Sequence, residues 1–263
     1  MPEYIREPDA IRRASLAAVR AAVDLEAVET QADPNYQAEK PAGDVSDLIA
    51  RRKLDLTAYQ GRRLARRYEK IVTRVRSRER EVAPDSEVLA DAVARNLFKL
   101  MAYKDEYEVG RLYSDGRFKA ELESQFEGDY TLTFHLAPPL WSKINPETGL
   151  PVKRDFGPWM GRAMTWLARF RFLRGTPLDI FGRTEERRVE RRQIEEYKAM
   201  IEEILPDLKS SNLSQAIRLA QIPEMITGYG HFKTRHREEA MALRDRLLVE
   251  WGAPGSSLPA AAE

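Results

Sequence analysis

The chain has 263 residues, and 43% of them are hydrophobic, which is enough for one large or two small domains with a real core. Its 43 basic and 42 acidic residues nearly cancel, so the net charge of +1 gives no overall reason to expect nucleic acid or an anionic membrane as a partner. The absence of cysteine excludes disulfides, thiolate zinc sites, a cysteine nucleophile and an iron–sulfur cluster bound by this chain. With a charged N-terminus and no apolar run of about eighteen residues, we expect a soluble, cytoplasmic protein.

Residues 1–48 are predicted to form an N-terminal helical arm and linker. Residues 11–28 have the pattern of an alanine-rich helix, and "QADPNYQAEKPAGD" after them has the composition of a linker. Residues 24–47 carry seven acids against Lys40, whereas residues 51–80 carry twelve Lys or Arg against three acids. This basic stretch could bind nucleic acid, but the acidic arm can cover it in cis or in trans, and we favour pairing with another protein chain.

Residues 49–252 are predicted to form one helical domain. Its first helix shows apolar residues at helical spacing, with arginines on the other side; they are Leu64, Tyr68, Ile71, Val72 and Val75. Asp85 or Ser86 can cap the next helix, which is the most apolar of the chain and is expected to run on to Asp115 and Gly116.

The only convincing strand follows a short helix at residues 118–126. Residues 130–136 alternate with a period of two, and "PVKRDF" at residues 151–156 is the expected pairing partner. Helical spacing returns at Trp159 and stops near Gly175. The sequence therefore predicts one small β-hairpin between helices.

The C-terminal part is predicted to be helical until a disordered tail at residues 253–263. Thr184 is an N-cap with acids in the first turn of its helix, and Pro206 ends that helix. Ser211 or Asn212 caps a short helix, and residues 240–251 form the last one. The fold class is therefore mainly α, with about seven helices.

Motifs for catalysis or metal binding are missing from this sequence. The three histidines do not have metal-ligand spacing, and no Gly-x-Ser-x-Gly elbow, Gly-x-Gly-x-x-Gly loop or Walker-type loop occurs. Asp105, Glu106 and Glu108 are interpreted as the polar face of a helix, because a proton-transfer role would need a pKa raised by burial. We therefore predict no catalytic, cofactor-binding or metal-binding residue.

Five stretches in order resemble a known family: "LFKLMAYKDEYEVGRLY", "QFEGDYTLTFHLAPPL", "FGPWM", "RFRFLRGTPLDIFGRTEERRVER" and "IPEMITGYGHFK". Together they resemble the C-terminal domain of the large fused indolepyruvate ferredoxin oxidoreductases, a branch of the 2-oxoacid:ferredoxin oxidoreductase family. The resemblance is strong over residues 97–232 and looser over residues 54–93.

The resemblance implies an accessory, non-catalytic subunit or domain. In that family an aryl 2-oxoacid is decarboxylated on thiamine diphosphate, electrons leave through iron–sulfur clusters to ferredoxin, and the acyl group passes to coenzyme A. Because the motifs for these cofactors are missing here, thiamine diphosphate and the clusters are expected in catalytic partner subunits. The alternatives are a stand-alone helical module that binds a small acid or a protein through His135, Arg154 and His231, and an independent enzyme built on Lys104, Glu106 and His135.

The segment of residues 129–160 is a candidate docking element. It contains stiff prolines and the residue types favoured at protein interfaces. The tryptophans could instead pack in the domain's own core. The candidate interface or binding residues are His135, Trp141, Arg154, Phe156, Trp159, Tyr229 and His231.

Overall fold

The structure, a computed structural model, describes residues 44–128, 130–137, 152–228 and 230–252. Helices dominate these residues and one pair of short strands accompanies them, so the mainly α fold with a small hairpin is confirmed. The described residues contain nine α-helices, close to the predicted seven. They are α2 (Val45–Tyr59), α3 (Arg62–Val82), α4 (Val88–Met101), α5 (Glu106–Ser114), α6 (Arg117–Gln125), α7 (Trp159–Arg169), α8 (Glu185–Ile204), α9 (Leu213–Gln221) and α10 (Gly230–Gly252).

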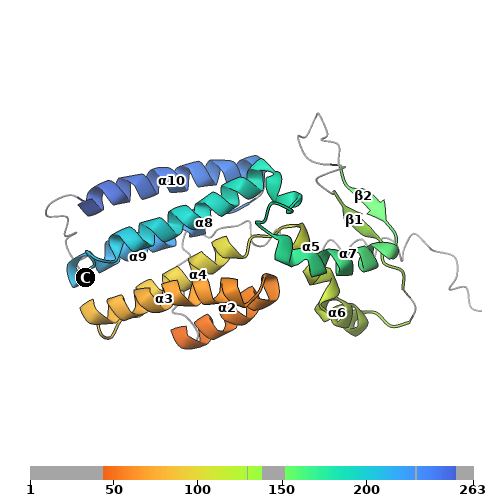
Figure 1. Cartoon of the computed structure of the whole chain (residues 1–263), viewed down its shortest axis with the longest axis horizontal. Helices are drawn as coiled ribbons and strands as arrows, with labels where there is room; N and C mark the ends of the chain where they lie inside the picture. The colour runs from red at the N-terminus through yellow and green to blue at the C-terminus, as the bar shows by residue number, and fades with distance from the viewer. Residues whose placement is uncertain (1–43, 129, 138–151, 229, 253–263) are drawn as a thin grey trace, which may run out of the picture.

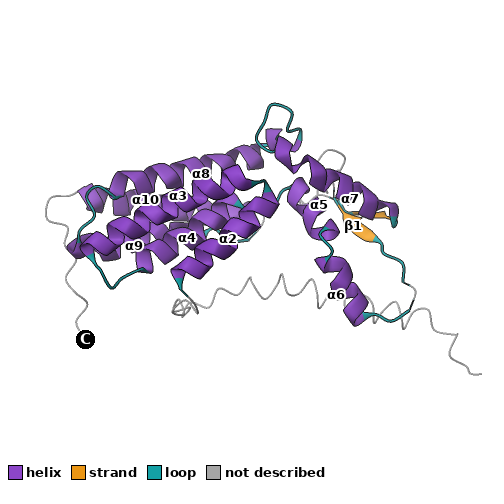
Figure 2. Cartoon of the chain, turned by 60° about the horizontal axis from the view of Figure 1, so that its bottom comes forward, coloured by secondary structure: helices purple, strands orange, loops and turns teal. Residues whose placement is uncertain are grey.

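The helices form two groups (Figures 1 and 2). Helices α2, α3, α4, α8, α9 and α10 lie alongside one another and are called the bundle here. Helices α5, α6 and α7, with strands β1 (Phe134–Leu136) and β2 (Arg154–Phe156), lie together beyond one end of it and are called the hairpin unit. The chain leaves the bundle between α4 and α5 and returns to it between α7 and α8.

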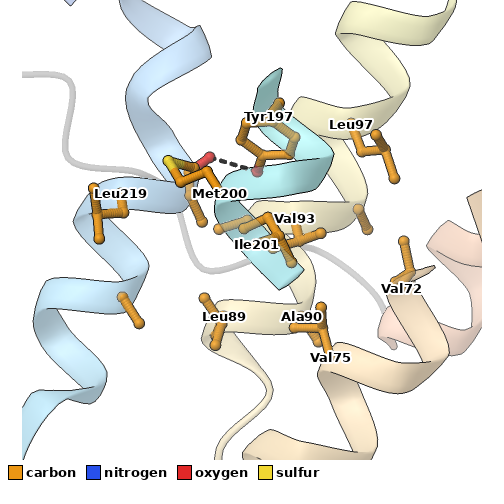
Figure 3. Close-up of a cluster of buried hydrophobic side chains, with 14 of the residues drawn as sticks. Val72, Val75, Leu89, Ala90, Val93, Leu97, Tyr197, Met200, Ile201 and Leu219 are labelled. Carbon is orange, nitrogen blue, oxygen red and sulfur yellow. Dashed lines mark hydrogen bonds between the residues drawn. The ribbon is translucent and has the colours of Figure 1, made fainter. Parts of the chain in front are cut away.

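The core of the bundle is built on the predicted apolar face of α3. Tyr68, Val72 and Val75 are completely buried in it. Val72 and Val75 face the apolar side of α4 (Figure 3), and the hydroxyl of Tyr68 donates a hydrogen bond to the carbonyl of Ala94 in α4 at 3.0 Å. Tyr197 of α8 enters the same core, where its hydroxyl donates a hydrogen bond to the carbonyl of Ala220 at 2.8 Å. Pairing this hydroxyl lets a large aromatic ring be buried without an unsatisfied polar group.

The bundle begins earlier than the predicted boundary at residue 49. Helix α2 starts at Val45, and Asp44 caps it by accepting a hydrogen bond from the amide of Ser46 at 2.9 Å. Val45 and Leu48 are buried in the bundle core. The last residues of the predicted linker are therefore part of the folded domain.

The prediction of one helix from Ser86 to Asp115 was wrong. Helix α4 ends at Met101, and Asp105 starts α5 by accepting a hydrogen bond from the amide of Glu108 at 2.8 Å. A short aspartate side chain competes with the helix for backbone amides and favours this N-cap position. The break lets the chain turn out of the bundle into the hairpin unit.

The N-terminus of α4 is capped mainly by a residue of α3. The completely buried carboxylate of Glu79 accepts hydrogen bonds from the amides of Leu89 at 2.9 Å and Ala90 at 2.8 Å. Ser86, one of the two predicted caps, lies 3.4 Å from the amide of Val88 and donates its own hydroxyl to Glu79 at 2.7 Å. A buried acid thus joins α3 to the positive end of α4.

The hairpin unit has its own small core. Strands β1 and β2 are antiparallel with Phe134 opposite Phe156, so the predicted pairing is confirmed, although β1 is shorter than the predicted residues 130–136. Phe134 packs with Met160 and Met164 of α7. Helix α5 packs closely on α7, and its residues Val109 and Tyr113 contact the same core.

The C-terminal helices follow the prediction in part. Thr184 caps α8, with its hydroxyl 3.4 Å from the amide of Arg187. Asn212 precedes α9, but its side-chain oxygen accepts from the amide of Lys209 instead. Helix α10 begins at Gly230, well before the predicted residue 240. The predicted helix at residues 11–28 and the predicted disordered tail at 253–263 lie outside the described residues.

Gly110 of α5 should be irreplaceable where α5 meets α7. A Cβ there would stand 2.9 Å from the carbonyl oxygen of Met164 and 3.2 Å from the amide nitrogen of Ala168. We expect Gly110→Ala to lower the free energy of unfolding by about 1–3 kcal/mol in urea titrations, because the two helices must separate.

Gly161→Ala in α7 is the matched control. Its Cβ would lie 3.8 Å from the ring of Phe134, an ordinary contact, and alanine favours a helix over glycine. This variant should be as stable as the parent or more so. Equal losses in both variants would contradict the close approach of α5 and α7.

Candidate interaction surface

Large apolar side chains of α7 point away from the hairpin core. Trp159 and Trp166 are each 60% exposed, and Phe170, directly after the helix, is 43% exposed. The helical period places these three residues on one side of α7, while Met160 and Met164 face the core. The sequence could not decide between an exposed and a core position for Trp159, and the structure shows it exposed.

The exposed aromatic residues continue past the end of α7 and lie beside an arginine. In the 3₁₀-helix Phe170–Leu173, Phe172 is 63% exposed and its ring centroid lies 6.3 Å from that of Phe170. The guanidinium of Arg169 lies 5.1 Å from the ring centroid of Trp166. We call Trp159, Trp166, Phe170 and Phe172 the tryptophan stripe. Contiguous exposed aromatic residues beside arginine are typical of protein-binding surfaces.

The hairpin joins the tryptophan stripe at one end. Phe156 is half-buried against the hairpin core, and its ring packs edge-on against Trp159 with centroids 5.9 Å apart. Two of the predicted interface residues therefore form one continuous aromatic surface. Trp166, Phe170 and Phe172 were not predicted, although the helical spacing of Trp159 and Trp166 is visible in the sequence.

The predicted pair His135 and Arg154 does not form a joint anion site. His135 lies opposite Asp155, and its Nδ1 is 2.6 Å from the Asp155 carboxylate. Arg154 lies opposite Leu136, so its side chain belongs to the other face of the two-stranded sheet. Trp141 and Tyr229 lie outside the described residues. His231 belongs to α10, but its side chain is not described.

Two links connect the bundle to the hairpin unit: the outgoing link, residues 102–105 between α4 and α5, and the return link, residues 170–184 between α7 and α8. A buried ion pair joins them. Arg174, 4% exposed, lies on the return link and binds the carboxylate of Asp105 on the outgoing link through two nitrogens, at 2.5 and 2.7 Å. The same guanidinium donates to the carbonyl of Tyr59 at 2.8 Å and stacks over its ring at 3.6 Å. Arg174 therefore fixes the end of α2 and both links at one point.

The return link is shaped by Asp179. Its buried carboxylate accepts hydrogen bonds from the amides of Gly175 and Gly182, each at 2.8 Å, and from the hydroxyl of Tyr107 at 3.3 Å. A Cβ at Gly182 would meet the Asp179 carboxylate at 2.2 Å, so only glycine fits. These contacts tie the return link to α5 of the hairpin unit.

A second charged cluster lies beside this junction. Arg187 of α8 pairs with Glu190 at 2.5 Å and stands 3.9 Å from Glu106 at the start of α5. Lys233 of α10 adds a bond to Glu190 at 2.8 Å. Burial raises the pKa of the Glu106 carboxyl, and its buried Oε2 has no hydrogen-bond partner among the described residues.

The described residues contain no group of three or more His, Cys, Asp or Glu side chains that could hold a metal ion. Within the same residues, no helix combines the length and the apolar character needed to cross a membrane.

Residues 45–246 match the model of a protein family that is described as a family of unknown function, DUF6537. The chain belongs to this family. The match covers both the bundle and the hairpin unit. No curated protein and no solved structure matches the chain.

The stability of the chain should depend on pH through Glu106. A carboxyl whose pKa is raised by folding binds protons more readily in the folded state, so its ionisation destabilises the fold as the pH rises through the folded pKa. We expect Glu106→Gln to unfold at higher urea concentration than the parent at pH 7. The difference should shrink as the pH falls toward about 4.3, the usual pKa of glutamate.

Glu185→Gln is the control, because Glu185 lies exposed in the first turn of α8. It should give no comparable gain at pH 7. A Glu106→Gln variant that is less stable than the parent at pH 7 would show that the Arg187 contact outweighs the burial of the charge.

Proposed function

We propose that this chain is an accessory, non-catalytic subunit or domain of an indolepyruvate (aryl 2-oxoacid):ferredoxin oxidoreductase. Its partners are the catalytic subunits that carry thiamine diphosphate and iron–sulfur clusters. The proposal rests first on the five ordered sequence stretches that resemble the C-terminal domain of these enzymes, all of which fall within the family match or overlap it.

The observation that carries a docking role is the tryptophan stripe. Trp159 and Trp166 are each 60% exposed on the outer side of α7, and aromatic residues of this kind supply much of the binding energy at protein interfaces. The stripe belongs to the hairpin unit, which lies beyond the end of the bundle (Figure 2). A partner could therefore bind it without displacing the bundle helices.

The chemistry of the chain supports an accessory role over a catalytic one. It has no cysteine for a cluster, and the candidate residue His135 forms an exposed pair with Asp155 on the hairpin. The decarboxylation and electron transfer would thus take place in the partner, and this chain would position or stabilise it. No nucleic-acid or membrane partner is part of the proposal.

The proposal is tested by purifying the tagged chain from its native cytoplasm and identifying the bound proteins, with a visible spectrum of the eluate. Recovery of thiamine- and cluster-bearing subunits in a brown eluate is the expected result. A colourless eluate with the 30.2 kDa chain alone would contradict it and would favour the alternative, a stand-alone helical binding module.

Replacing both tryptophans of the stripe should weaken the complex. Trp159→Ala with Trp166→Ala should raise the dissociation constant at least about thirtyfold, since truncating a tryptophan that is a hot spot of an interface costs about 2 kcal/mol or more. Binding of the purified partner is measured by calorimetry. The control is Val249→Ala, a residue 76% exposed on α10 of the bundle, which should bind like the parent.

A further inference from the structure

A groove runs between α3 and α8. Both helices pack on α4 and touch each other little (Figure 1). Two neighbouring cavities of about 320 and 170 Å³ lie between them and share the lining residues Arg67, Ile71 and Lys198. We call this feature the α3/α8 groove.

Hydrogen bonds close the groove at both ends. Arg78 of α3 reaches the carbonyls of Leu205 and Leu208 at 3.2 and 2.8 Å, just after α8. Gln60 donates to the carbonyl of Arg174 at 3.1 Å at the other end. The lining of α3 extends from Leu64 to Arg74. At 1.5 Å per residue this stretch is about 16 Å long.

The groove combines an apolar floor with a basic wall. Its aliphatic lining residues are Leu64, Ile71, Met101, Ile194, Ile201 and Leu205. Arg67, Lys70 and Arg74 of α3 are exposed along it, and none of the three has an ion pair with another described residue. Basic side chains outnumber the two acids of the lining, Glu195 and Glu202, and Glu195 is already paired with Lys198 at 2.7 Å. Such a surface suits an amphipathic acidic peptide.

The same chain contains a segment with this chemistry. Residues 24–33, "DLEAVETQAD", hold four acids and no base. Leu25 and Val28 lie in the predicted helix of residues 11–28 and have the spacing of one helical face, with acids on both sides of it. As a helix, this segment would be about 15 Å long, close to the length of about 16 Å of the groove.

The point where the chain enters the fold is within reach of the groove. Asp44 and Ser46, at the start of α2, are hydrogen-bonded to Arg76 of α3 at 3.4 and 2.9 Å. Arg76 lies on a different side of α3 from the groove residue Arg74. Residues 34–43 extend to at most about 33–36 Å, and a helix is only about 10–12 Å wide. The linker can therefore pass around α3.

We propose that residues 24–33 bind in the α3/α8 groove of their own molecule, with Leu25 and Val28 on the apolar floor and their acids beside Arg67, Lys70 and Arg74. The short linker keeps the segment at a high effective concentration, so weak contacts suffice. Since the charged contacts are exposed, salt weakens them. This inference does not depend on the proposed partner enzyme, and it makes the groove a surface that an acidic partner segment must compete for.

The test is disulfide trapping in the full chain, which has no cysteine of its own. Leu25→Cys is combined with Glu202→Cys, an exposed residue of the groove lining. The matched control combines Leu25→Cys with Glu203→Cys, the next residue, which is also an exposed glutamate but lies a third of a turn away, outside the lining. Glu202 and Glu203 are both on the surface, so neither of these changes should disturb the fold.

The groove pair is expected to form an internal disulfide about tenfold faster than the control pair at low salt, and this difference should shrink at 1 M salt. The difference in rate should shrink in the same way when the four acids of the segment are replaced by their amides, that is, at Asp24, Glu26, Glu29 and Asp33. Equal rates for the two pairs would overturn the proposal. A disulfide between two chains, seen as a dimer on a non-reducing gel, would assign the groove to a second copy and overturn binding within one molecule.

Discussion

The arrangement of the molecule depends on the buried ion pair between Arg174 and Asp105. The hairpin unit is connected to the bundle by two links, and this pair joins them at the point where the chain leaves and returns. A charge this deeply buried is tolerated only when it is paired and hydrogen-bonded, and here both conditions are met, because the guanidinium also binds the carbonyl of Tyr59. Moving the two links apart would break this pair and its bond to Tyr59.

This constraint gives the hairpin unit a defined position without a large apolar contact to the bundle. The pair works together with the bonds of Asp179 to Tyr107 and with the cluster around Arg187, which connect α5 to the return link and to α8. The small core around Phe134 and Met164 then holds α7 with its tryptophan stripe outward. A surface that binds a partner benefits from being held in place before binding, because less freedom is lost on association.

Residue patterns predict the helices well where one face is buried. Spacing and turn chemistry predict the apolar face of α3, the cap at Thr184 and the pairing of the hairpin strands. The break after Met101 could not be predicted, because "AYKDEYE" continues the helical pattern and Asp105 is recruited by an arginine far away in the sequence. The cap supplied by Glu79 is another tertiary contact that local rules attribute to Ser86.

The candidate surface was predicted only in part for a similar reason. Trp159 and Phe156 are both predicted interface residues and lie together, but whether Trp159 faces solvent depends on which side of α7 packs on the hairpin. His135 lies on β1 and Arg154 on the neighbouring strand β2, yet the strand register places their side chains on opposite faces of the sheet. Register depends on how the two strands meet, which a single sequence does not reveal.

The most direct test of this account is a double-mutant cycle on Asp105→Ala and Arg174→Ala, with hydrogen exchange of α7 amides as a second measurement. Each single change should lower the free energy of unfolding by about 3–5 kcal/mol, since it leaves one charge buried alone. The double change should cost at least about 2 kcal/mol less than the two losses added together, and α7 should lose protection in each variant. Additive losses with unchanged protection of α7 would contradict the view that this pair holds the hairpin unit on the bundle.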